Sequence, residues 1–422
     1  DYALGGYRDR IVVELAQNAA DAARRAGVPG RLRLVLAGDT FTAANTGAPL
    51  TAAGVESLAT LRASAKRDES ETGAIGRFGV GFSTVAAFSD SVTVASRSGA
   101  VRWDLDLARA AVRDGLLDSG RARPELAEEL ERRDWRIPLL RLPFCGDAAP
   151  PEGYDTAVTL VLRDTEARER LRGLLDSTGE ALLLALTDLA EVRVDTGDGE
   201  RVITRTAGKA DGEVLTGVRD RGGERSTYWR TVTRTGRFEP SLVADRPTEE
   251  RARLDWSVTW AAPVDPDGGV TDLPPGVDRV VHAPTPSDEE LALPALLIGT
   301  FPLGPDRRRI ALGPATDALI AEAADAYCDL LCRLGARAAP DLVPVGFMRG
   351  GEFDARFRAA VAKPIGDAPF LTTVGGDPVR PRDAIVLEGG PEVVGALADL
   401  FTTALPGDQH PHHPALAALP VR

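Results

Sequence analysis

The sequence of 422 residues has little of what marks a secreted or membrane protein. Its three cysteines are too few to cross-link a chain of this length, so a reducing compartment, the cytoplasm, is expected. No stretch reaches the roughly 18 apolar residues of a membrane helix, and the first ten residues lack the apolar segment of a signal peptide. These absences predict a protein without membrane contact.

Positive charge is also scarce. The formal net charge is −13, and lysine occurs only at positions 66, 209 and 363. Proteins that bind nucleic acid over a broad surface need many Lys and Arg side chains to neutralise the phosphates. The charge balance therefore argues against nucleic acid as a partner, although it is compatible with a small basic patch. Because lysine is so rare in this chain, a lysine inside a motif is a stronger candidate for a functional residue.

The first part of the chain alternates helix and strand patterns. Apolar residues at helical spacing predict a helix over residues 8–26, and strand patterns follow within 31–45 and at 154–163. A helix predicted over 166–189 completes a first domain, 1–195.

After residue 195 the character of the sequence changes. Strand-like runs rich in Thr, Val and Trp alternate with Pro and Gly turns and lead to a helix predicted over 315–334. This pattern, in a chain too long for one ordinary core, predicts a second domain over 196–336 and a small mixed subdomain over 337–422.

The first predicted helix carries polar residues within its apolar pattern. In the segment ELAQNAADA, Glu14, Asn18 and Asp21 are spaced i, i+4, i+7 and share one face. Taken alone, such a stripe is more simply a solvated face. With partners elsewhere it has a chemical interpretation, because the Asn18 oxygen suits Mg²⁺ and the Glu14 carboxylate can orient and deprotonate a water.

The partners follow later in the chain. Asn45 ends a strand pattern and Gly47 lies in the turn after it, and the glycine-rich run GAIGRFGVGF (73–82) directly precedes a predicted helix. Backbone N–H groups can converge on anionic oxygens at such a loop. The loop is not a Walker motif, since no GK[ST] follows, and no βαβ unit frames it as a dinucleotide site.

These motifs, in this order, resemble those of the GHKL ATPases, and the run RFGVGFSTVAAF is similar to the heat-shock chaperone branch. The segments ANTGAP and LRASAKR are similar to its sacsin-related members. The resemblance implies an α+β protein whose first domain is a Bergerat-type two-layer α/β sandwich with a mixed, largely antiparallel sheet. It also implies a second α/β domain of the middle type and a small C-terminal subdomain.

The resemblance implies a role for each matching residue. Glu14 would be the general base, Asn18 the Mg²⁺ ligand, and Asp21 part of the pocket near the nucleoside. Asn45 stands where most relatives have the Asp that binds adenine, and its amide can serve the same base edge. Thr156 would complete base binding, although a threonine in a strand is also an ordinary β-former. The remaining predicted nucleotide-binding residues are Gly47, Lys66, Gly76, Arg77, Phe78, Gly79, Val80, Gly81 and Phe82.

The resemblance implies two further elements for ATP hydrolysis, a lid over the nucleotide and an arginine from the second domain. Residues 64–73 would form a short, polar lid that closes over the nucleotide, with Lys66 reaching phosphate, unless that lysine is simply exposed. In the second domain, Arg307, Arg308 or Arg309 would reach the γ-phosphate as an arginine finger in cis, although for any one of them a surface ion pair is the simpler interpretation.

The resulting prediction is a slow, Mg²⁺-dependent ATPase that acts like a molecular chaperone, in which ATP closes the lid and docks the second domain. Its partners would be ATP or ADP and protein clients or partner domains, with a homodimer on nucleotide binding. Two alternatives stay open, namely a nucleotide-binding switch without turnover and a nucleotide-gated DNA clamp of the mismatch-repair or gyrase type. A histidine kinase ranks last, because no phosphoacceptor His with a dimerising helix pair is visible.

Overall fold

The structure is a computed structural model whose chain forms two compact units. Unit 1 comprises Asp1–Thr178, Leu186–Thr204 and Val218–Glu224, and unit 2 comprises Gly179–Ala185, Arg205–Gly217 and Arg225–Arg422. The residues that the structure describes are 10–59, 84–85, 87–117, 124–133, 142–246, 251, 254–283, 286–293, 295–304, 308–344, 350–385, 403–405 and 419.

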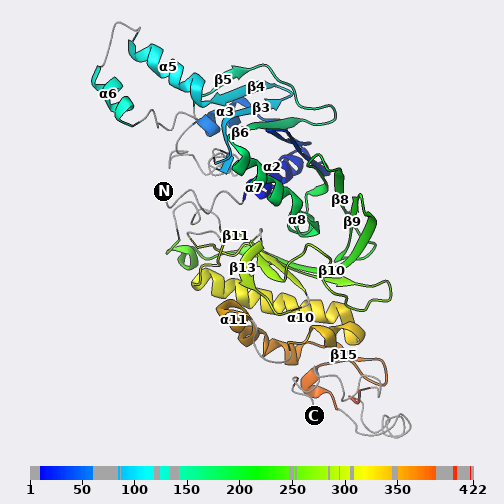
Figure 1. The fold of residues 1–422 in the computed structure, drawn as a ribbon. Helices are drawn as coiled ribbons and strands as arrows, with labels where there is room; N and C mark the ends of the chain where they lie inside the picture. The colour runs from blue at the N-terminus through cyan, green and yellow to red at the C-terminus, as the bar shows by residue number, and fades with distance from the viewer. Residues whose placement is uncertain are drawn as a thin grey trace. The chain divides into compact units, whose positions relative to one another are not determined.

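A largely antiparallel sheet forms the centre of unit 1, in the strand order β8-β7-β1-β2-β6-β3-β4-β5 (Figure 1). The pair β1–β7 is parallel, and the other pairs of this series are antiparallel. The strands are β1 (Gly30–Ala37), β2 (Thr40–Asn45), β3 (Ser89–Ser96), β4 (Gly99–Asp104), β5 (Phe144–Gly146), β6 (Thr156–Leu162), β7 (Leu189–Asp195) and β8 (Glu200–Ala207).

One face of this sheet is buried beneath helix α2 (Ile11–Ala26), which packs against β1 and β7. Along β1 the side chains of Leu32 and Leu34 are buried while those of Arg31 and Arg33 stay at least partly exposed, as period-2 alternation dictates. Gly27 ends α2 in the left-handed region at φ 65°. The other helices of unit 1 are α3 (Ala52–Ala59), α5 (Leu105–Leu117), α6 (Pro124–Arg132) and α7 (Thr165–Asp176).

Unit 2 pairs β10, β11, β14, β12 and β13 in that order, and its helix α10 packs along β11 with α11 beside it (Figure 1). Its strands are β10 (Gly223–Arg237), β11 (Asp255–Val264), β12 (Val280–His282), β13 (Pro286–Glu290), β14 (Leu296–Gly299), β15 (Leu371–Thr372) and β16 (Pro378–Val379). The residues of β8, of β9 (Glu213–Asp220) and of β10 are divided between the two units. The helices of unit 2 are α8 (Glu180–Ala185), α10 (Pro314–Leu342) and α11 (Glu352–Val361), with short 3₁₀ turns η3 (Pro240–Val243), η4 (Pro364–Asp367) and η5 (Pro381–Asp383).

The core of unit 2 is built around aromatic rings on β11 and the two long helices. Trp260 lies 4.7 Å from Tyr327 and 5.2 Å from Phe357, measured between ring centroids, and its indole N–H donates to Ala323 O at 2.8 Å. Leu405 and Leu419, near the end of the chain, belong to the same hydrophobic cluster. The predicted subdomain 337–422 therefore shares its core with the rest of unit 2.

The expected mixed α+β class with a largely antiparallel sheet is confirmed. The single helix predicted over 166–189 was wrong, because the chain forms α7 and α8 with a break at residues 177–179. The hydroxyls of Ser177 and Thr178 both donate to Leu174 O, and such bonds compete with helix continuation. Within the described ranges, no helix combines the length and the apolar character that a membrane span requires.

Candidate functional site

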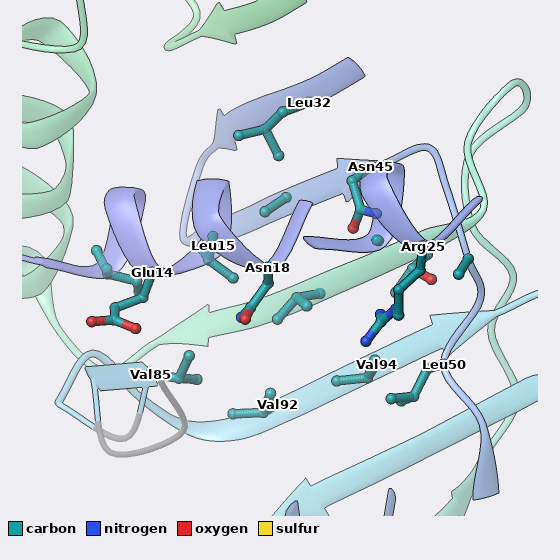
Figure 2. A pocket seen from close by; sticks show the side chains of 16 residues that line it. Glu14, Leu15, Asn18, Arg25, Leu32, Asn45, Leu50, Val85, Val92 and Val94 are labelled. Atoms are coloured by element: carbon teal, nitrogen blue, oxygen red, sulfur yellow. The ribbon is translucent and has the colours of Figure 1, made fainter. Parts of the chain in front are cut away.

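A pocket in unit 1 lies between α2 and the strands β2, β3 and β6 (Figure 2). Most of its lining is apolar, and the side chains from β3, for example, are Val92 and Val94. A largely apolar pocket with a few convergent polar groups is the usual form of a small-molecule site. The polar side chains that line it are Glu14, Asn18, Arg25, Asn45 and Thr156.

Helix α2 supplies three of these polar side chains from one face. Asn18 follows Glu14 by one turn, and Arg25 follows Glu14 by 11 residues, which is about three turns. Figure 2 shows Glu14 and Arg25 toward opposite ends of the pocket, with Asn18 between them. The Glu14 side chain is 15% exposed, and its Oε1 lies 3.8 Å from Arg10 Nε. The pocket therefore has a carboxylate at one end and a guanidinium at the other.

Asn45 and Thr156 come from neighbouring strands and lie side by side. They are direct partners in the antiparallel register of β2 and β6, and side chains at such positions stand on the same face of the sheet. Asn45 Nδ2 donates to Thr46 O at 3.1 Å, and its Oδ1 points into the pocket (Figure 2). The Thr156 hydroxyl oxygen is buried and has no hydrogen-bond partner in the described part of the chain. A buried polar atom without a partner is costly, and this one lines a pocket, so the pair offers unused hydrogen-bonding capacity there.

The turn after Asn45 is pressed against α2, and this contact explains Gly47. Its φ is +126°, and a Cβ added there would lie 2.5 Å from the carbonyl carbon of Ala22. The next residue, Ala48, donates its backbone N–H to Ala22 O at 2.9 Å. Only glycine fits this combination of conformation and close approach. The wall of the pocket formed by residues 46–50 is thus held directly to the helix that carries Glu14 and Asn18.

Asp155 fixes the same wall from the other side. Its carboxylate accepts from the Gly47 backbone N–H at 2.8 Å and pairs with Arg97 Nε at 2.6 Å. Its own backbone N–H donates to Asn45 O at 2.9 Å. Further along the wall, Leu50 N donates to Ser96 Oγ at 3.0 Å. The wall is therefore preorganised before any ligand arrives, and sequence reasoning missed Asp155, whose one signal was its place directly before Thr156.

Asp21, predicted to frame the pocket, lines no part of it in the described residues. Its carboxylate pairs with Arg24 at 3.1 Å, and Arg24 also pairs with Asp188 at 2.6 Å. The Asp188 bond is the largest cause of a raised pKa at Arg24. Arg25, by contrast, lines the pocket and was not predicted, although its helical spacing from Glu14 and Asn18 could have pointed to it.

The residues present fit a nucleotide with Mg²⁺. The unpartnered Thr156 hydroxyl and the Asn45 Oδ1 offer hydrogen bonds to a base edge, and Val92 and Val94 offer an apolar surface to its face. Asn18 offers a hard oxygen toward the other end, and hard oxygen donors are the ligands that Mg²⁺ prefers beside phosphate oxygens and water.

The predicted glycine-rich loop and lid lie outside the described residues, as does Arg307. Arg308 is described, in unit 2, where it pairs with Asp288 at 3.2 Å. That an arginine of this segment reaches a phosphate stays a prediction. The other predicted residues outside the described ranges are Lys66, Gly76, Arg77, Phe78, Gly79, Val80, Gly81 and Phe82.

Comparison with known proteins adds no assignment. The chain matches no family model, and it matches no curated protein.

Proposed function

We propose that unit 1 binds ATP in this pocket and, with Mg²⁺, hydrolyses it slowly. The observation that carries the proposal is the pairing of Asn45 and Thr156, whose free polar atoms meet at one end of an apolar pocket. Glu14 lies toward the other end with Asn18 before it (Figure 2). A base-binding end and a phosphate end are thus separated along α2.

The base end is complementary to adenine. Asn45 Oδ1 is an acceptor for the 6-amino group, and the Thr156 hydroxyl can donate to the neighbouring ring nitrogen, N1. Guanine presents an acceptor where adenine presents the amino group, so its O6 would face Asn45 Oδ1 without a hydrogen atom between them. The bond from Asn45 Nδ2 to Thr46 O favours the orientation in which the amide oxygen faces the ligand.

The phosphate end carries the chemistry of hydrolysis. Mg²⁺ held there would neutralise phosphate charge, and Asn18 is the protein oxygen placed to hold it. Glu14 orients a water toward the γ-phosphorus and takes its proton as the new P–O bond forms and the bond to the β-phosphate oxygen breaks. The products are ADP and inorganic phosphate. Slow turnover, in which ATP acts chiefly as a conformational ligand, is part of the proposal and rests on the sequence resemblance.

The fold of unit 1 supports a Bergerat-type assignment. The mixed sheet has one face covered by a helix that carries the polar residues of the pocket, and the base-binding pair lies on adjacent antiparallel strands. The chaperone-like use of the ATPase, with protein clients and a sacsin-like kinship, is part of the proposal and rests on the sequence resemblance alone. The net charge of −13 weighs against the DNA clamp.

Calorimetric titration of the full chain with ATP, GTP and ADP, with and without Mg²⁺, tests the proposal. We expect ATP to bind and GTP to bind at least tenfold more weakly, and Asn45→Leu to reduce ATP affinity by about 10- to 100-fold, since it removes the acceptor for the amino group. Asn18→Ala should remove the Mg²⁺-dependent part of the affinity. Thermal unfolding of each variant shows whether the fold is kept.

Equal binding of ATP and GTP would refute the adenine assignment, and failure of the folded parent to bind either would refute the pocket's function. If the parent binds Mg-ATP without turnover above background, the nucleotide switch replaces the ATPase.

A further inference from the structure

Two consecutive arginines of α2 have different surroundings. Arg24 is engaged by two carboxylates, with Nη1 at 3.1 Å from Asp21 and Nη2 at 2.6 Å from Asp188. Arg25 makes no ion pair and no side-chain hydrogen bond within the part of the chain that the structure describes, and it lines the pocket. Asp21 stands one turn before Arg25, where an i, i+4 pair is common, but Arg24 occupies that carboxylate. Arg25 is therefore a free guanidinium beside the pocket.

The position of Arg25 along the helix places it at the base end. It lies seven residues beyond Asn18, which is about 10 Å along the helix axis at about 1.5 Å per residue. Figure 2 shows Arg25 on the same side of the pocket as Asn45 and Leu50, and away from Glu14. Of the groups at this end, Leu50 is apolar and Asn45 meets the base edge, so Arg25 is the one cation among the described lining residues.

We propose that Arg25 is a binding residue for the nucleoside half of the nucleotide, which closes the base end of the pocket over adenine and its ribose; this inference rests on the proposed ATP binding. A guanidinium is planar and weakly hydrated, so it stacks on a flat ring and donates hydrogen bonds at its edge to ribose hydroxyls. Because no carboxylate competes for it among the described residues, its orientation is set by the ligand. The contact adds affinity without taking part in hydrolysis.

The experiment compares Arg25→Ala with the parent for three ligands, adenosine, ADP and ATP, by calorimetry at about 0.3 M salt. That ionic strength screens the general attraction between a surface cation and phosphate, because the Debye length falls to well below 10 Å. A nucleoside contact predicts the same loss, about three- to tenfold, for all three ligands. Arg25→Lys keeps the charge and loses the plane, so it should recover only part of the affinity.

Arg168→Ala is the matched control, since it removes the same type of side chain from a partly exposed position on α7 that, among the described residues, does not line the pocket and has no contact with Asp21 or Arg25. Its ATP affinity should stay within about twofold of the parent. A loss at Arg25→Ala that grows from adenosine to ATP assigns the residue to phosphate and overturns the inference. An unchanged affinity for all three ligands overturns it too, while ATP binding by the parent leaves the proposed function standing. A parent that binds none of the three refutes the proposed function itself.

Discussion

Two threonines on strands, one in each unit, show how differently the chain treats a buried hydroxyl. In unit 2, Thr216 is fully buried, and its Oγ1 donates to Glu180 Oε2 at 2.6 Å and accepts from Trp229 Nε1 at 2.8 Å. In unit 1, the buried Oγ1 of Thr156 has no partner among the described residues. A hydroxyl whose hydrogen bonds are all made stabilises a core, whereas the Thr156 hydroxyl beside the pocket keeps unused hydrogen-bonding capacity, which the proposed function assigns to a ligand.

His282 shows that a buried polar atom without a partner does not by itself indicate a binding site. Its Nε2 is also buried without a partner in the described part of the chain, yet the residue lies on β12 in unit 2 among packed apolar side chains. Burial lowers the pKa of His282 to about 4, against a weaker opposing effect of Asp278, so the ring stays neutral near pH 7. A missing partner therefore indicates a binding site only where the atom also lines a pocket, as Thr156 does.

The largest effect is expected where the pocket carries chemistry. Glu14→Ala should lower the rate of ATP hydrolysis on the order of a hundredfold to ten-thousandfold, because it removes the base that positions the water. ATP affinity should change little, since in the proposed mechanism the carboxylate would contact the water and not the nucleotide. Single-turnover hydrolysis beside equilibrium binding measures both quantities.

Glu166→Ala is a control for this variant, since Glu166 is exposed in the first turn of α7. It should match the parent in rate and affinity. Equal hydrolysis by Glu14→Ala and the parent would remove Glu14 from the mechanism.

The next largest effect is the pH dependence of folding stability that His282 in unit 2 produces. The unfolded chain takes up a proton at His282 near pH 6.5, whereas the folded chain does so only near pH 4. Between these values the unfolded state binds more protons, so folding stability falls as the pH falls, by about 3 kcal/mol over the whole window. Denaturant unfolding of the parent and of His282→Gln at several pH values measures this. The variant should lack that part of the slope, and parallel slopes would contradict the assignment.

The sequence predicted some parts of the site better than others, for physical reasons. Helical spacing, which is local, puts Glu14 and Asn18 on one face, and the resemblance to a motif set implied their place in a pocket. The structure brings both to one pocket with Asn45 and Thr156. The role of Asp155 could not be predicted from spacing, because its bond to Gly47 joins residues 108 positions apart.

Helical spacing puts Asp21 on the face that carries Glu14 and Asn18, and the resemblance implied a place in the pocket for it, but its carboxylate pairs with Arg24. Arg24 is in turn held by Asp188, which is remote in sequence. That arrangement leaves Arg25 free for the pocket. The spacing of residues along a helix therefore predicts which side chains share a face. Ion pairs with distant segments determine which of those side chains are left without a partner and can contact a ligand.

Thr216→Val tests the buried hydroxyl that makes hydrogen bonds within the core. The change keeps the shape but leaves Glu180 Oε2 and Trp229 Nε1 without their shared partner, which should cost about 2 kcal/mol of folding stability. Denaturant unfolding measures the loss. ATP affinity should be unaffected because Thr216 belongs to the packed core. Unchanged stability would mean that these bonds contribute nothing net.

Thr156→Val makes the same change at the buried hydroxyl that has no partner in the described part of the chain, and its expected effect on stability and ATP affinity is the smallest. Because the Thr156 hydroxyl has no partner among the described residues, replacing it with a methyl group of the same shape should leave folding stability unchanged or slightly higher. ATP affinity should fall by about fivefold, or roughly 1 kcal/mol, through loss of one hydrogen bond to the base.

The control for Thr156→Val is Thr159→Val on the same strand but the opposite face, where the Thr159 hydroxyl lies 3.4 Å from that of Thr42. It should bind ATP as the parent does. Calorimetry and thermal unfolding of both variants decide the matter. A stability loss at Thr156→Val as large as that at Thr216→Val would show that its hydroxyl serves the fold and would contradict its proposed role in ligand binding, because removal of a hydroxyl used only for a ligand should lower affinity and not stability.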